Sequence, residues 1–215
     1  MVFFKLTNPE EGTWEKNKKD FIKDLKKIEE RFRQIDEDLF AQNFISADAE
    51  KRNKAEENLK KLLASVTYER DMITKLQINH LSDMDKERMN EIEMTARKIA
   101  LASDSAMSIA HEIGAMIWDV NYRAQMLDAP MGQVEAETNT KLAGVQDQAK
   151  KEEIFREAEA KKQQILANAM NSRESFAQGY VNQLLAMGRA ELESKIREMA
   201  LREINKEEQK EKEEN

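Results

Sequence analysis

The sequence predicts an all-α protein, an elongated bundle of three or four long helices with coiled-coil-like packing. Its 215 residues include only 6 glycines and 2 prolines, so few positions favour turns. Charged residues make up 36% of the chain and aromatic residues 6%, a composition typical of long helices. The hydrophobic residues, 40% of the chain, fall at regular heptad spacing, which distinguishes the chain from a disordered one.

One helical domain is expected over residues 13–208, between two short terminal segments. Residues 1–12 combine a strand-like VFFKL with a turn-forming NPEEG, and residues 209–215 form a charged, solvated tail. Within the domain, helices are expected at about 13–43, 47–128 and 135–208. The chain is therefore expected to consist almost entirely of helix.

The first helix carries the clearest heptad pattern. Thr13 is a good N-cap residue, and two interleaved series of apolar residues recur every seven positions after it. The two series are Trp14, Phe21, Ile28 and Ile35, and Leu25, Phe32 and Leu39. Such a seam is typical of a helix that packs along other helices.

The second helical region leaves open whether it is one helix or two. Ser46 is a suitable N-cap residue for its start. One apolar stripe follows at Leu59, Leu62, Val66, Ile73 and Leu76. The pattern slips between Gln77 and Arg88, so a break near 77–83 would create a fourth helix. A strict heptad then resumes over residues 92–127.

The strongest corner in the sequence is Asp128–Gly132, which reads DAPMG. A proline stops a helix and a glycine permits reversal of the chain. The second and third helices are therefore expected to form a long antiparallel hairpin that turns at Asp128–Gly132. The apolar stripe of the third helix is expected to include Phe155, Ala158, Ile165 and Ala169.

A run of small residues predicts close helix packing in the second helical region. The stretch IALASDSAMSIAHEIGAMI (99–117) repeats a small residue every four positions from Ala102 to Gly114, which places them on one helix face. The expected interface comprises Ile92, Ala96, Ile99, Ala102, Ala106, Ala110, Ile113, Gly114 and Ile117. Three interpretations stay open: antiparallel packing against the third helix, an interface between subunits, or conditional insertion into a membrane. Asp104 and Glu112 make the last one costly.

The N-terminal segment offers an apolar anchor formed by Phe3, Phe4 and Leu6. Two interpretations fit these side chains. They pack against the first helix of their own chain, or they dock in extended form on a partner protein.

Residue types that carry chemistry in enzymes are sparse or unpatterned. The chain has no cysteine, and its two histidines, His80 and His111, lack the glutamate three positions earlier that a di-iron helical bundle requires. Nucleotide-binding and nucleophile motifs are absent from the sequence. We therefore predict no catalytic, metal-binding or cofactor-binding residue, and we expect no cofactor.

Charge and hydropathy limit the classes of partner and compartment. The net charge of −7 disfavours nucleic acid, so no specific nucleic-acid partner is predicted. The six lysines of KNKKDFIKDLKK are ascribed to the solvated face of the first helix. MVFFKL is too short for a signal peptide, and no window offers 18 uncharged apolar residues. Synthesis in the cytoplasm, and a place within a virion or another large assembly, is expected.

These features together favour a non-catalytic structural subunit of a large macromolecular assembly. Long helices rich in Ala, Gln and Met resemble, in composition, multi-copy virion-associated proteins of the phage internal or ejection type, or secretion-conduit proteins. Copies of the chain itself and other proteins of the assembly are the expected partners. The alternatives are a coiled-coil adaptor or tether between other proteins, and a membrane-active helical protein that inserts after a rearrangement.

Overall fold

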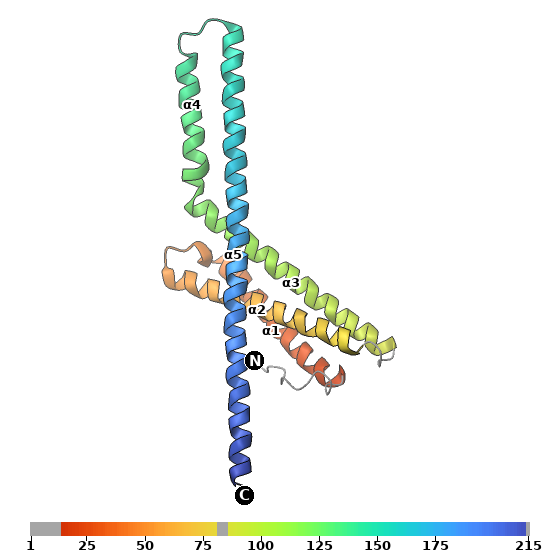
Figure 1. Ribbon diagram of the computed structural model, residues 1–215. Helices are drawn as coiled ribbons and strands as arrows, with labels where there is room; N and C mark the ends of the chain where they lie inside the picture. Colours follow the sequence, from red (N-terminus) through yellow and green to blue (C-terminus); the bar gives the residue numbers. More distant parts are fainter. Residues whose placement is uncertain (1–13, 81–85, 214–215) are drawn as a thin grey trace. The chain divides into compact units, whose positions relative to one another are not determined.

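The computed structural model describes residues 14–80 and 86–213, and these residues are all-α, as the sequence predicts. The α-helices are α1 (Trp14–Phe40), α2 (Ala49–His80), α3 (Lys86–Asn121), α4 (Ala129–Leu142) and α5 (Gln148–Glu213) (Figure 1). A 3-10 turn, η1 (Asn43–Ile45), lies between α1 and α2, and a π-helical segment, η2 (Ala124–Asp128), precedes α4. Within these ranges the structure has no strand and five α-helices, where the sequence predicted three or four.

The contacts within the chain form two compact units. Unit 1 comprises the described residues up to Ile109 and those from Asn182 onward, and unit 2 comprises Ala110–Val181. Unit 1 thus holds α1, α2, the first part of α3 and the second part of α5. Unit 2 holds the end of α3, η2, α4 and the first part of α5.

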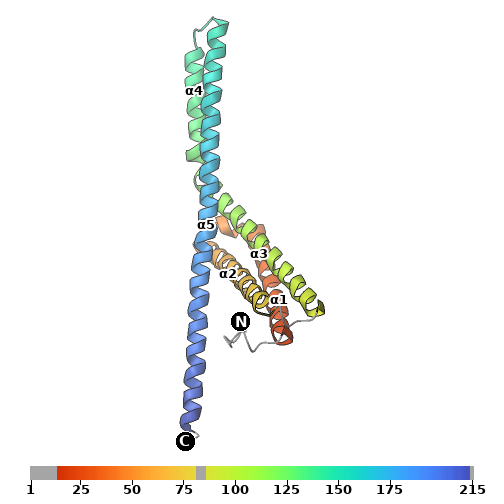
Figure 2. The same ribbon diagram turned by 45° about the vertical axis from the view of Figure 1, so that its right-hand side comes forward.

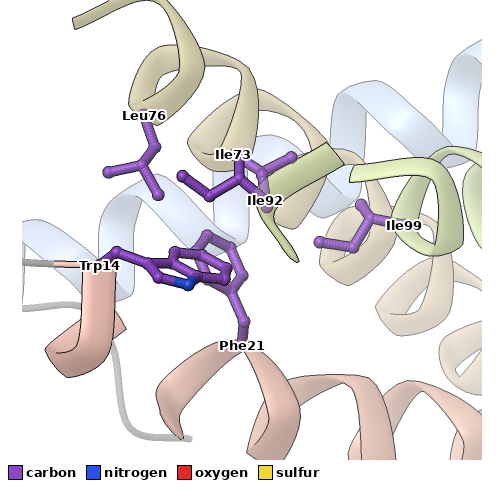
Figure 3. Packing of buried hydrophobic residues seen from close by; sticks show 6 residues of the cluster. All are labelled: Trp14, Phe21, Ile73, Leu76, Ile92 and Ile99. Carbon is purple, nitrogen blue, oxygen red and sulfur yellow. The ribbon is translucent and has the colours of Figure 1, made fainter. Parts of the chain in front are cut away.

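The core of unit 1 joins residues from three helices. Each of the three helices contributes two buried residues (Figure 3). They are Trp14 and Phe21 of α1, Ile73 and Leu76 of α2, and Ile92 and Ile99 of α3. The pairs on α1 and α3 are seven residues apart, so two turns of helix bring both side chains to one face. The heptad pattern therefore located the buried side chains of these helices correctly.

Polar contacts hold the edge of this core. The indole Nε1 of Trp14 donates a hydrogen bond of 2.9 Å to the Glu91 carboxylate, and Lys18 binds the other oxygen of that carboxylate at 2.7 Å. The Trp14 and Phe21 rings lie 6.1 Å apart between centroids. Trp14 is 2% exposed, so its N–H needs this acceptor when it is buried.

The connection from α1 to α2 is tight. Gln42 has a left-handed backbone (φ 53°), and Phe44 is buried behind it. The buried Asp38 accepts hydrogen bonds from the side-chain amides of Asn43 (2.8 Å) and Asn58 (3.0 Å). Asp48 then caps α2 by accepting the Glu50 N–H at 2.9 Å.

The second helical region consists of two helices. α2 ends at His80 and α3 begins at Lys86, which agrees with the alternative of a break near 77–83. Residues 81–85 lie outside the described residues.

The predicted corner at Asp128–Gly132 is wrong, because the chain remains helical there. Pro130 lies in the first turn of α4, where a proline is tolerated because the first N–H groups of a helix have no acceptor within it. The π-helical segment η2 ends at Asp128, two residues before this proline. Its wider hydrogen-bond pattern accommodates the backbone hydrogen bond that a proline cannot donate. Gly132 continues the helix, and a Cβ atom added to it would contact no neighbouring side chain or helix within 4 Å.

The chain reverses instead between Leu142 and Gln148. Gly144 has φ +84°, a left-handed conformation that glycine adopts without a steric penalty. The Val145 N–H bonds to the Leu142 carbonyl at 3.1 Å, and the Asp147 carboxylate accepts the Ala149 N–H at 2.9 Å to cap α5. A glycine after one helix and an aspartate before the next were the available sequence signals for this turn.

In unit 2, α4 and the first part of α5 run side by side and antiparallel, as both ribbon views show (Figures 1 and 2). Three ion pairs fix the register: Glu135–Lys162 at 2.8 Å, Glu137–Lys161 at 3.3 Å and Lys141–Glu157 at 3.2 Å. In these pairs the residue numbers rise along α4 while the numbers of their partners fall along α5, so the two helices are antiparallel. Val134 of α4 and Ala158 of α5 are buried and lie beside each other between the two helices.

Candidate interaction surfaces

The end of α3 packs very closely on α5 within unit 2. A Cβ atom added to Gly114 would lie 3.0 Å from the Cα of Ala177 and 3.2 Å from the Cβ of Tyr180. Trp118, one turn later, is 3% exposed and its indole N–H lies 3.3 Å from the Ser172 hydroxyl. The absence of a side chain at Gly114 therefore permits the two backbones to approach each other.

Directional contacts flank this close approach. The Arg173 guanidinium binds both carboxylate oxygens of Asp119, with Nε to Oδ1 at 3.0 Å and a terminal nitrogen to Oδ2 at 2.9 Å. This hydrogen bonding raises the pKa of Arg173 above its ordinary value. The Tyr122 and Phe176 rings lie 5.5 Å apart between centroids. These contacts fix the register of α3 on α5.

The structure buries most of the small-residue interface that the sequence predicted. Six of its residues are buried: Ile92, Ile99, Ala106, Ala110, Ile113 and Gly114. Three are half-buried: Ala96, Ala102 and Ile117. The first two isoleucines and Ala96 belong to the core of unit 1, and Gly114 lies against α5 in unit 2. The chain's own helices therefore cover several of these residues.

A second close approach, which the predicted interface does not include, occurs in unit 1. A Cβ atom added to Gly188 of α5 would lie 2.9 Å from the Ala64 Cβ and 3.0 Å from the Lys60 carbonyl oxygen. The Lys60 ammonium is buried and binds Glu191 at 2.5 Å and also Glu57, and these bonds raise the pKa of Lys60. A small residue on each helix was the only sequence signal for this contact.

A carboxylate occupies a core position between α1 and α2. Glu69 falls between Val66 and Ile73 in the α2 stripe, is 5% exposed, and its Oε2 has no hydrogen-bond partner within the described part of the chain. Burial, reinforced by Asp24 of α1 and opposed by Lys27, raises the pKa of Glu69 to about 8. The heptad spacing marks this position, but a stripe defined by apolar residues alone omits it.

Large apolar side chains are exposed along one flank of α5 in unit 2. Phe155 is 56% exposed, Leu166 43% and Met170 61%, and we call these three residues the α5 apolar stripe. They are separated by eleven and four residues, close to three turns and one turn, so they share a helix face. The prediction that Phe155 is part of the buried stripe is wrong, because its side chain is exposed while Ala158 and Ala169 of the same predicted stripe are buried.

A further exposed apolar group surrounds the π-helical segment η2. Val120 is 57% exposed, Tyr122 41% and Met126 43%. A π-helical segment inside a longer helical stretch often marks a functional position. Unit 2 thus exposes apolar side chains both on α5 and beside η2.

The described residues hold no cluster of three histidine, aspartate or glutamate side chains that could bind a metal ion. None of the described helices is both long and apolar enough to span a lipid bilayer. The predicted N-terminal anchor of Phe3, Phe4 and Leu6 lies outside the described residues.

Comparison with known proteins adds no relationship. No family model matches the chain, and neither a curated protein nor a solved structure is similar to it. The function has to be inferred from the surfaces described above.

Proposed function

We propose that this chain is a non-catalytic structural subunit of a large assembly, and that copies of it associate through unit 2. The observation that carries the proposal is that α5 buries small side chains in unit 2 and exposes large apolar ones. Ala158 and Ala169 are buried, while Phe155 and Met170 are exposed. Small buried residues contribute little apolar area, so the exposed stripe supplies much of the apolar surface that the hairpin can still bury.

The mixed charge of the hairpin surface favours a multi-copy assembly over a single-copy one. Most soluble oligomers are closed homo-oligomers, and the two-fold interfaces that are commonest among them require self-complementary surfaces. The α4–α5 hairpin displays lysines and glutamates on both of its helices, for example Lys141 and Glu137 on α4 and Lys162 and Glu157 on α5. A surface with both signs of charge suits contact with a copy of itself.

The class of assembly follows only from composition. Long helices rich in Ala, Gln and Met favour a virion-associated protein of the phage internal or ejection type, or a secretion-conduit protein. The partners are then further copies of the chain and other proteins of the same assembly.

Light scattering coupled to size exclusion tests the proposal, with circular dichroism on the same sample. A helical species several times the chain mass of 25.0 kDa is expected. Substituting both Phe155→Ser and Met170→Ser should reduce that mass without loss of helicity. The matched control, Ala160→Ser with Ala167→Ser, changes two exposed alanines on α5 away from the stripe and should leave the mass unchanged.

A helical monomer at all concentrations would contradict self-assembly and favour the adaptor or tether function. Binding of the monomer to vesicles, measured by flotation, would instead favour the membrane-active function.

A further inference from the structure

We propose that α5 pairs with the α5 helix of a second copy in antiparallel orientation, about a two-fold axis level with the midpoint between Ala160 and Lys161. The inference rests on the self-assembly proposed above and specifies its contact. In this arrangement Phe155 lies opposite Leu166 of the copy, and Glu159 lies opposite Lys162 of the copy. Because of the two-fold symmetry, each of these contacts occurs twice in the dimer.

The spacing of the residues carries the first step. Phe155, Glu159 and Lys162 are followed by Leu166, so the intervals are four, three and four. This alternation is a heptad seam, in which successive side chains lie along one line of the helix surface. The apolar ends of the seam are exposed at 56% for Phe155 and 43% for Leu166, and Glu159 between them is also exposed.

Charge selects the orientation. A parallel pair would place Glu159 against Glu159 and Lys162 against Lys162, two like-charge contacts in the middle of the seam. The antiparallel pair replaces them with two contacts between opposite charges and places the apolar residues against each other at both ends. A charged pair within an apolar seam also fixes the register, because a shift by one heptad would leave both charges without a partner.

The existing contacts of Lys162 are compatible with the pairing. Its ammonium binds Glu135 of α4 at 2.8 Å, and its side chain is 30% exposed. An ammonium has three donors, so a second carboxylate can bind without displacement of the first. Met170 lies one turn beyond Leu166, beside the seam, and opposite Lys151 of the copy, whose aliphatic stem can cover it.

Charge reversal tests this contact in the full chain. Glu159→Lys or Lys162→Glu alone should weaken self-association roughly tenfold, because the axis counts each like-charge contact twice. The double variant, which exchanges the two charges, should recover most of the loss. The matched control Glu153→Lys makes the same change of charge at an exposed position on the other side of α5 and should leave self-association unchanged.

Cysteine pairs report the orientation directly, because the chain has no cysteine of its own. With mild oxidation, a chain with both Phe155→Cys and Leu166→Cys should form disulfide-linked dimers, and either single variant should not. Linking of the Phe155→Cys chain alone would show parallel pairing and overturn the proposal, although self-assembly would stand. Self-association that is unchanged in Glu159→Lys, in Lys162→Glu and in the double variant would also overturn the proposal. A wild-type monomer would remove both this contact and the self-assembly on which it rests.

Discussion

Gly114 of α3 lies against Ala177 of α5, and a Cβ atom on Gly114 would be 3.0 Å from the Ala177 Cα. The neighbouring atom is backbone and cannot rotate away, so the helices have to separate to admit a methyl group. Gly114→Ala should therefore lower the free energy of unfolding by about 1–3 kcal/mol, despite the better helix propensity of alanine. Urea denaturation followed by circular dichroism measures the change.

The matched control is Gly179→Ala, also within a helix but with no atom within 4 Å of its added Cβ. Helix propensity alone should then raise stability by about 0.5–1 kcal/mol. Equal effects of the two substitutions would mean that α3 and α5 do not approach each other at Gly114.

The heptad pattern predicted the buried side of α1 well and that of α5 poorly. Trp14, Phe21 and Ile28 are large, so their spacing alone determines which face of α1 is buried. In α5 the large Phe155 and the small Ala158 are both apolar and three residues apart. A count of apolar positions therefore cannot decide which of the two is buried.

The position of the hairpin could not be read from proline and glycine alone. Pro130 and Gly132 are both present at the predicted corner, yet the first turn of a helix accepts a proline. The deciding feature is a backbone conformation, φ +84° at Gly144, which composition does not report. The candidate surface on α5 was missed for the same reason, since it depends on which residues the hairpin covers.

Gly144→Ala tests the true position of the turn. Gly144 has a left-handed backbone conformation, which is unfavourable for any residue with a Cβ atom. The free energy of unfolding should therefore fall by about 1–2 kcal/mol. Gly132→Ala is the matched control at the corner that the sequence predicted, and within a helix it should be neutral or stabilise by up to about 1 kcal/mol. The thermal midpoints of both variants measure the difference. The opposite ranking would return the turn to Asp128–Gly132.

Trp14 should be among the most sensitive positions of unit 1. Its side chain is 2% exposed, packs on Phe21 and donates to Glu91, so Trp14→Ala removes both volume and a hydrogen bond. A loss of about 3–5 kcal/mol in unfolding free energy is expected, measured by urea denaturation. Ile22→Ala on the same helix is the control: the side chain is 47% exposed, and the change should be about 1 kcal/mol or less. Similar losses at both positions would place Trp14 outside the core.

Glu69 should make unit 1 less stable as pH rises. Its pKa is about 8 in the folded chain against an ordinary value of 4.5, so the folded state retains a proton that the unfolded state releases between these values. Stability from this group is therefore complete below about pH 4.5, falls by up to about 1.4 kcal/mol per pH unit, and levels off above about pH 8. Glu69→Gln keeps the shape of the protonated side chain without the ionisation.

The difference in unfolding free energy between Glu69→Gln and the wild type isolates this slope from that of the other acidic residues. The difference should grow in favour of the glutamine variant from pH 5 to pH 8, because the wild type has to bury a charge there. Asp24→Asn should reduce the wild-type slope, since Asp24 adds to the shift at Glu69. A difference for Glu69→Gln that stays constant over this pH range would show that Glu69 is ionised in the folded chain at neutral pH.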